Sequence, residues 1–121
     1  MKVIRRRGVT FYQASGAKYY YICQDEVNAE AVSRIGENAM AINDVTPEAL
    51  AEFILTGKTS LEYSYILATD NTKAGEGLKQ KLMQAFDKNK ICYADCFTLR
   101  MYESCQTIGE LIRRFNDEKT Y

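Results

Sequence analysis

Apolar residues follow two alternating patterns along this chain. Short, nearly continuous apolar runs are typical of strands covered on both faces, and they occur at residues 18–23, 38–43, 63–69 and 91–99. Apolar residues at helical spacing, with charged residues between them, occur at residues 28–36, 46–55, 73–88 and 107–115. This order predicts an α/β fold, with an open, mostly parallel sheet of about four strands flanked by helices.

Helical periodicity also predicts which side chains face the core. In the first helix, Ala29, Val32 and Ile35 share one side and are expected to point inward. In the third helix, the lysines lie opposite a stripe of leucine and phenylalanine, so Lys79 is expected to face solvent. Thr46 is expected to cap the second helix, because a proline and a glutamate follow it.

The first 17 residues do not follow this alternation. The stretch VIRRRGVTFYQASGAKYYY predicts a β-hairpin, which either leads into the first sheet strand or forms an added edge. A chain of 121 residues suffices for one compact core, and no linker or repeat divides it. We therefore expect a single domain over residues 1–121, with the hairpin as an extension at residues 1–17.

The charge balance and the absence of histidine limit which ligands and which catalytic groups this chain can use. The chain has 16 basic and 16 acidic residues and no histidine, so its formal net charge is zero and no strong field draws it to nucleic acid or anionic membranes. The absence of histidine excludes Ser-His and Cys-His nucleophiles. Chemistry at this protein must use carboxylates, lysine, tyrosine or a metal ion.

The sequence has only weak signals for a membrane segment, for secretion and for paired cysteines. No apolar run approaches the roughly 18 residues of a membrane span, and the start MKVIRRRGVTF lacks the apolar stretch of a signal peptide. We therefore expect a cytoplasmic protein with no membrane partner. The cysteines have irregular spacing and are expected to be reduced core thiols, with Cys92 and Cys96 on one face of a strand.

Two predicted strands end in acidic residues. The segment CQDE follows the first strand at residues 23–26, and TDN follows the third at residues 69–71. In open parallel sheets, ligands bind beyond the carboxyl ends of the strands, at the point where the strand order reverses. These two strand ends are therefore the candidate functional site.

The same segments resemble the Toprim domain, the metal-binding module of bacterial and phage primases, topoisomerases of types IA and II, and small nucleases. That family has a strand ending in Glu-Gly, a helix opening with Asp-Ala-Leu, a short strand, a helix, and an apolar strand ending in Asp-x-Asp-x-x-Gly. Here the matching tracts are YYYICQDEVNAEAVSRIGENAMAI and ILATDNTKAG, and NAMAI before a Thr-Pro helix start is similar to primases. The resemblance covers roughly residues 18–100.

The resemblance implies a glutamate acting as general acid or base and aspartates that hold Mg²⁺ against phosphate oxygens. Asp70 matches the first aspartate, and Thr72 stands where the second would fall. In an ungapped register, Gln24 takes the glutamate position and Asn28 the helix-opening aspartate, so three of the four acids are neutral. Mg²⁺ is then expected to bind weakly or not at all.

A second register remains open. It slides the first tract by two residues, placing Glu26 at the glutamate position and Glu30 at the helix-opening acid. The ungapped register is favoured because it leaves Glu30 exposed and keeps the apolar side of the helix inward. Either register leaves Thr72 in place of an acid.

Other residues near these tracts have both a plain and a functional interpretation. Asp70, Asn71 and Thr72 are also suited to capping the helix that begins near Lys73. Lys73 could offer an ammonium to Asp70 or to phosphate, and Gly75 could allow a close approach of the backbone to a ligand; solvation of the lysine and simple tolerance of the glycine are the alternatives. The dense basic patch, a candidate phosphate or nucleic-acid contact, comprises Arg5, Arg6 and Arg7.

The leading hypothesis is a primase-type Toprim-like domain tied to DNA replication or mobile-element nucleic-acid metabolism, with a degenerate metal site that is weak or inactive. Expected partners are nucleic acid and other replication or primase domains. The first alternative is an active Mg²⁺-dependent nuclease or nucleotidyl transferase that uses Glu26, Glu30 and Asp70. The second is a non-enzymatic, flavodoxin-like protein-interaction module. Enzymatic activity itself is left open by the sequence, as is the oligomeric state.

Overall fold

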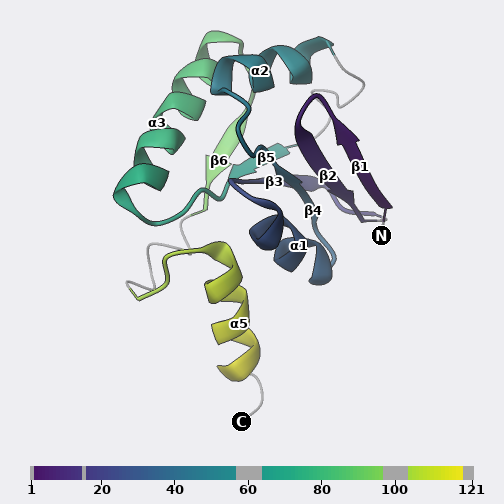
Figure 1. Cartoon of the computed structure of the whole chain (residues 1–121), viewed down its shortest axis with the longest axis vertical. Coiled ribbons are helices and arrows are strands. Elements are labelled where there is room, and N and C mark those ends of the chain that lie inside the picture. The colour runs from purple at the N-terminus through teal and green to yellow at the C-terminus, as the bar shows by residue number, and fades with distance from the viewer. Residues whose placement is uncertain (1, 15, 57–63, 97–103, 119–121) are drawn as a thin grey trace.

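The structure, a computed structural model, describes residues 2–14, 16–56, 64–96 and 104–118 (Figure 1). Strands and helices alternate from β3 onward, as the apolar pattern predicts. In chain order the elements are β1 (Lys2–Arg6), β2 (Val9–Gln13), β3 (Tyr19–Cys23), α1 (Glu26–Arg34), β4 (Asn38–Ala41), α2 (Pro47–Thr56), β5 (Ser64–Leu67), α3 (Lys73–Lys88), β6 (Tyr93–Asp95) and α5 (Ile108–Glu118). Residues 1 and 15 of the predicted extension, and residues 63 and 97–99 of the predicted strands, lie outside the described residues.

The α/β class is confirmed, but the sheet is larger than expected and mixed. It has six strands in the order β1-β2-β4-β3-β5-β6. Strands β4, β3, β5 and β6 run parallel, whereas β2 is antiparallel to both β1 and β4. The expectation of about four strands was too small because the predicted N-terminal hairpin joins the sheet edge. It does so because Val9 to Tyr12 are all buried, so β2 must be covered on both sides.

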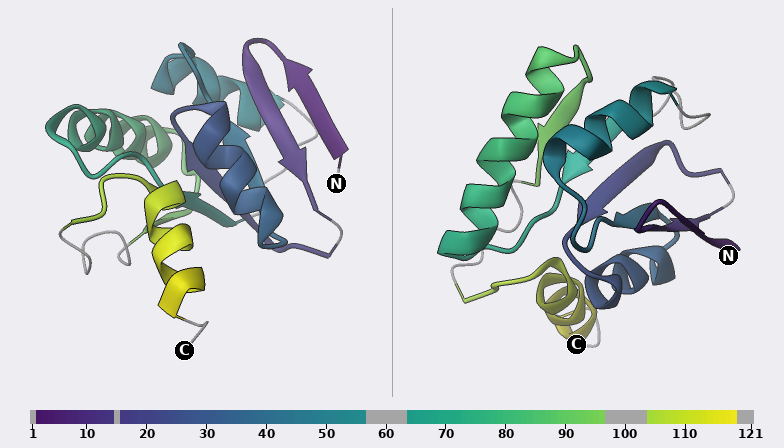
Figure 2. Two further views of the ribbon diagram at one scale, coloured as in Figure 1. Left: turned by 60° about the horizontal axis from the view of Figure 1, so that its bottom comes forward. Right: turned by 45° about the horizontal axis from the view of Figure 1, so that its top comes forward.

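Helices cover both faces of the sheet (Figures 1 and 2). Helices α2 and α3 pack on one face, where Tyr20 and Tyr65 lie stacked beneath them. Helices α1 and α5 pack on the other face, over Cys23 and Ala68. Successive strand residues point to opposite faces, so the near-continuous apolar runs supply both cores at once.

Two expectations about helix faces were wrong. Ile35 is 53% exposed, because α1 ends at Arg34 and Ile35 is its C-cap, beyond the buried stripe. Lys79 is buried, only 3% exposed, because acidic side chains pair with its ammonium inside the protein. Thr46 does cap α2, accepting the backbone N–H of Ala49 at 3.2 Å. No helix in the described residues has the length and apolarity needed to cross a membrane.

Candidate functional site

The two acidic strand ends lie side by side, as the sequence predicts. β3 pairs in parallel with β4 on one side and β5 on the other, so the chain changes direction in the sheet at β3. Ile22 is in register with Leu67, which brings the residues after β3 next to those after β5. We call the meeting place of these two strand ends the strand-end crevice, a name for its position in the sheet, and define it by Gln24, Asp25 and residues 69–72.

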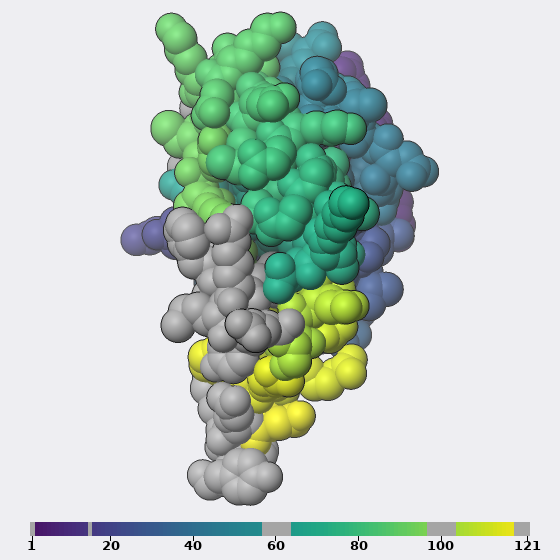
Figure 3. Space-filling model, turned by 90° about the vertical axis from the view of Figure 1, so that its left-hand side faces the viewer, coloured from purple at the N-terminus to yellow at the C-terminus, as the bar shows by residue number. Residues whose placement is uncertain are grey.

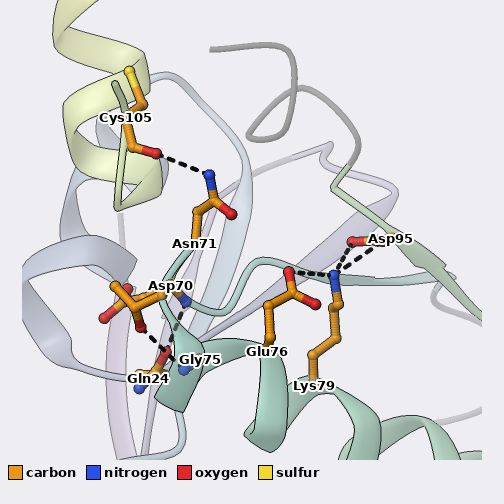
Figure 4. A network of polar contacts seen from close by, with 9 residues as sticks. Gln24, Asp70, Asn71, Gly75, Glu76, Lys79, Asp95 and Cys105 are labelled. Atoms are coloured by element: carbon orange, nitrogen blue, oxygen red, sulfur yellow. Dashed lines mark hydrogen bonds and ion pairs between the residues drawn. The ribbon is translucent and has the colours of Figure 1, made fainter. Parts of the chain in front are cut away.

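Gln24 is the side chain that turns toward Asp70 (Figure 4). The backbone N–H of Asp70 donates a hydrogen bond to Oε1 of Gln24 at 2.7 Å. The ungapped register therefore places a neutral amide directly against Asp70. That amide ties the end of β3 to the end of β5.

Glu26 and Glu30 are directed to other partners. The carboxylate of Glu26 accepts hydrogen bonds from Thr10 Oγ1 at 3.0 Å and from Arg5 at 3.1 Å. These two bonds lower the pKa of Glu26 below its ordinary value. Glu30 forms an ion pair with Arg34 one turn further along α1. Gln24, and neither Glu26 nor Glu30, is thus the side chain of this segment that binds at Asp70.

Asp25 and Asn28 form the N-terminal cap of α1. Oδ1 of Asp25 accepts both the backbone N–H and the side-chain amide of Asn28, each at 2.9 Å. The side-chain oxygen of Asn28, Oδ1, accepts the backbone N–H of Gly109 at 3.0 Å. Asn28 is buried, with 6% of its surface exposed. Its amide nitrogen bonds within the cap of α1, and its oxygen joins α1 to the start of α5.

Thr72 and Gly75 shape the start of α3. Thr72 is the N-cap, and its Oγ1 accepts the backbone N–H of Gly75 at 3.1 Å. A Cβ at Gly75 would lie 1.9 Å from the backbone oxygen of Asp70. The close approach that Gly75 permits is therefore to the protein's own backbone, and the plain capping interpretation of Thr72 is confirmed.

Residues 105–107, the segment that leads into α5, lie against the crevice. The backbone N–H of Asn71 donates to the oxygen of Gln106 at 2.6 Å, and its side-chain amide donates to the oxygen of Cys105 at 3.2 Å. Figure 4 shows Asn71 reaching toward Cys105, and Figure 3 shows the start of α3 above the residues that lead into α5. Sequence reasoning missed this contact, because no local signal joins residue 71 to a segment 34 residues later.

The electrostatics of the crevice disfavour a second negative charge. Asp70 is half-buried, and burial raises the pKa of its carboxyl group above the ordinary value of 3.8; the negative charges of Asp25 and Glu110 raise this pKa further. Within the part of the chain that the structure describes, no three acidic, cysteine or histidine side chains are grouped to hold a metal ion. Gln24, Asn28 and Thr72 already bind backbone groups, so this donor set does not fit Mg²⁺.

A buried cation does lie nearby, and it is a lysine. The ammonium of Lys79 is 2.9 Å from Glu76 and 3.2 Å from Asp95, which joins α3 to the end of β6 (Figure 4). The sequence carried a partial signal, since Asp95 also comes at a strand end and Glu76 precedes Lys79 by one turn. Lys73, the lysine singled out from the sequence, is exposed at the first position of α3.

The three arginines are dispersed around the hairpin. Arg5 pairs with Glu26, and the guanidinium of Arg7 lies 5.9 Å from the ring centre of Phe53. Arg6 is exposed at the end of β1. β1 runs in the same direction as β4 and β3. The turn of the hairpin, which follows β1, therefore lies at the same end of the strands as the crevice.

The cysteines do not form a metal cluster among the described residues. All four are free thiols, Cys23 and Cys105 are buried, and burial raises the pKa of Cys23. Cys96 follows β6 and is half-buried against the core under α1 and α5, whereas Cys92 precedes β6 and is exposed, so Cys92 is not the core thiol that the sequence predicted.

Comparison with known proteins finds no family model that matches the sequence, no curated protein that matches it, and no solved structure that matches the fold.

Proposed function

We propose that this chain is a primase-type Toprim-like domain whose metal site has lost most of its acids, and that it serves DNA replication or mobile-element nucleic-acid metabolism without catalysis of its own. The observation that carries the proposal is the hydrogen bond between Gln24 and the backbone of Asp70. At the position where the family has a general acid or base, a neutral amide holds two strand ends together.

The chemistry of Mg²⁺ supports an inactive site. This ion gives up its hydration reluctantly and needs several hard oxygen ligands, usually carboxylates together with phosphate. The crevice holds two carboxylates, but Asp25 is exposed and already caps α1 through Oδ1, which leaves the half-buried Asp70. The neutral side chains at the other family positions, Gln24, Asn28 and Thr72, bind the protein's own backbone. This donor set cannot offset the lost hydration, so Mg²⁺ is expected to bind weakly or not at all.

The proposal includes nucleic acid and other replication or primase domains as partners of this chain. The candidate phosphate contacts are Lys73 and the arginines at residues 5–7, which lie along the sheet edge that carries the crevice. A domain without its own catalysis would act together with other replication or primase domains. The active nuclease with Glu26, Glu30 and Asp70 is less well supported, because Arg5, Thr10 and Arg34 already engage both glutamates.

A flavodoxin-like interaction module is the second candidate, and one observation favours it. The parallel strands lie in the order second, first, third, fourth, which flavodoxin-like sheets share. This candidate and the leading proposal agree that the crevice has no catalytic metal. They differ in one expected result. If the leading proposal is right, restoring the acids of the Toprim family restores metal binding; if the chain is an interaction module, it does not.

A magnesium titration followed by amide NMR shifts tests the proposal. We expect no saturable shift at Asp70 at sub-millimolar Mg²⁺, and neither cleavage nor primer synthesis. The variant Q24E/T72D restores two acids, and Asp remains a good N-cap at position 72, so we expect it to gain saturable binding. The matched control is E26Q/T72D, which adds the same acid at position 72 and none against Asp70.

Two results would contradict the proposal. Sub-millimolar binding with activity in the natural protein, lost in Glu26→Gln and kept in Gln24→Ala, would establish the nuclease instead. Equal metal binding by Q24E/T72D and E26Q/T72D would show that Gln24 does not occupy a metal-site position, which would favour the interaction module.

A further inference from the structure

Among the described residues, no strand pairs with the outer edge of β1. Within the described residues β1 pairs with β2 alone, and Figure 1 shows it as the outermost strand beside β2. Its residues are exposed except Ile4, which is half-buried against the core under α2. An open strand edge presents a row of backbone N–H and C=O groups to which another chain can add.

The hairpin turn determines which backbone groups face outward. Arg7 and Gly8 both have positive φ, 50° and 83°, as a two-residue type I′ turn requires, and Arg6 and Val9 close the turn in register. Backbone groups alternate between facing the partner strand and facing away from it. Counting back from Arg6, the groups of Val3 and Arg5 face away from β2.

The side chains on this edge are basic. Lys2 and Arg6 flank Ile4 on one face of the hairpin, and Arg5 lies beside Val3 on the other, with no acidic residue on the strand. The ion pair of Arg5 with Glu26 is exposed on both sides, 72% and 42%, so it is weak and another carboxylate can replace Glu26.

These charges discriminate between occupants of the edge. Two copies of β1 paired antiparallel about Ile4 would place Lys2 opposite Arg6, and like charges directly opposite are destabilising. Nucleic acid is disfavoured because the basic side chains are divided between both faces of the hairpin and the whole chain has no net charge. A partner strand with carboxylates opposite Lys2, Arg5 and Arg6 would pair with these charges, and its backbone would hydrogen-bond to the outward groups of β1.

We propose that the β1 edge binds an extended acidic segment of a partner protein, which adds to the sheet beside β1. The backbone groups of Val3 and Arg5 supply the new ladder, and the basic side chains select the acidic partner. This inference does not depend on whether the strand-end crevice binds a metal ion, so the metal-site proposal can fail or hold separately. It assigns Arg5 and Arg6 to an acidic protein segment, in place of the phosphate contacts named under the proposed function.

A designed peptide tests it. Antiparallel to β1, the segment Glu-Glu-Val-Thr-Glu places its glutamates opposite Arg6, Arg5 and Lys2 and its threonine opposite Val3. The control peptide, Glu-Glu-Val-Pro-Glu, has the same charge but lacks the N–H that faces Val3. The protein variant Val3→Pro removes the matching N–H without removing a bond to β2, and Val3→Thr keeps it.

Fluorescence anisotropy measures the binding of each labelled peptide to each variant, with circular dichroism to verify folding. We expect saturable binding of the first peptide, about tenfold weaker for the proline peptide and for Val3→Pro, and unchanged for Val3→Thr. Equal affinity for both peptides, or no saturable binding, would overturn the proposal. A single-stranded oligonucleotide that binds the natural protein and Val3→Pro equally well, where the peptide fails to bind, would assign the basic edge to nucleic acid.

Discussion

Asn28 accepts a hydrogen bond from the backbone N–H of Gly109, 3.0 Å away in space and 81 residues later in the chain. Together with the contacts of Asn71 to Cys105 and Gln106, it docks the start of α5 onto the residues that follow β3 and β5. In the Toprim-like alignment that we propose, Asn28 stands at the position of an acid. Here its amide serves packing between two distant helices.

This contact predicts a stability effect. Asn28→Ala leaves the N–H of Gly109 without its buried acceptor, so we expect the free energy of unfolding to fall by about 1–3 kcal/mol. Urea denaturation followed by circular dichroism measures it. Asn116→Ala, on the exposed part of α5, is the matched control and should change stability by less than about 0.5 kcal/mol. Equal effects of the two substitutions would show that the Asn28 contact contributes nothing particular.

Two glycines in the first turns of α3 should respond in opposite directions to alanine. At Gly75 a Cβ would meet the backbone oxygen of Asp70 at 1.9 Å, and a backbone atom cannot move aside cheaply, so we expect Gly75→Ala to lose about 3 kcal/mol or more. At Gly77 nothing lies within 4 Å of a Cβ, so Gly77→Ala should gain about 0.5–1 kcal/mol. Thermal unfolding of both variants measures the difference, and a stabilising Gly75→Ala would contradict the close contact.

The sequence predicted the alternation of elements, the bounds of α3 and the meeting of the two strand ends. These features depend on local periodicity and on the rule that parallel strands deliver their carboxyl ends to one edge. The sequence did not predict that Lys79 is buried, because helical periodicity assigns a lysine to solvent unless a distant acid, here Asp95, is known to lie opposite.

The number of strands in the sheet is a second feature that local patterns did not predict. The sequence predicted a hairpin, either leading into the first sheet strand or forming an added edge, but its position beside β4 depends on long-range pairing between Thr10 and Ala41. The docking of α5 on the crevice likewise depends on contacts such as that of Asn71 with Cys105, which no spacing along the chain encodes.

Removal of the buried ammonium is predicted to be costly. Lys79→Met removes the ammonium that pairs with Asp95, whose side chain is only 16% exposed, and breaking a buried pair in this way costs about 3–5 kcal/mol. Lys81→Met, on the exposed side of the same helix, should change stability by less than about 0.5 kcal/mol. The double variant K79M/D95N removes both charges and should recover part of the loss. Chemical denaturation of the three variants tests the pair, and a neutral Lys79→Met would show that Asp95 is hydrated without the lysine.

The raised pKa of Asp70 predicts how stability depends on pH. Burial, with Asp25 and Glu110 nearby, raises the pKa of Asp70 in the folded state above its ordinary value of 3.8, so the folded protein favours the protonated carboxyl group. Stability from this group is therefore fully present below pH 3.8 and is lost as the pH rises through the raised pKa.

Asp70→Asn cannot ionise, so it should be more stable than the natural protein at pH 7, and the difference should shrink toward zero in acid. Melting temperatures of both proteins between acid and neutral pH measure the effect, with the exposed Asp44→Asn as control. A stabilisation by Asp70→Asn that persisted unchanged in acid would come from the amide's hydrogen bonding, and the burial of a charged Asp70 would then not limit the stability of the crevice.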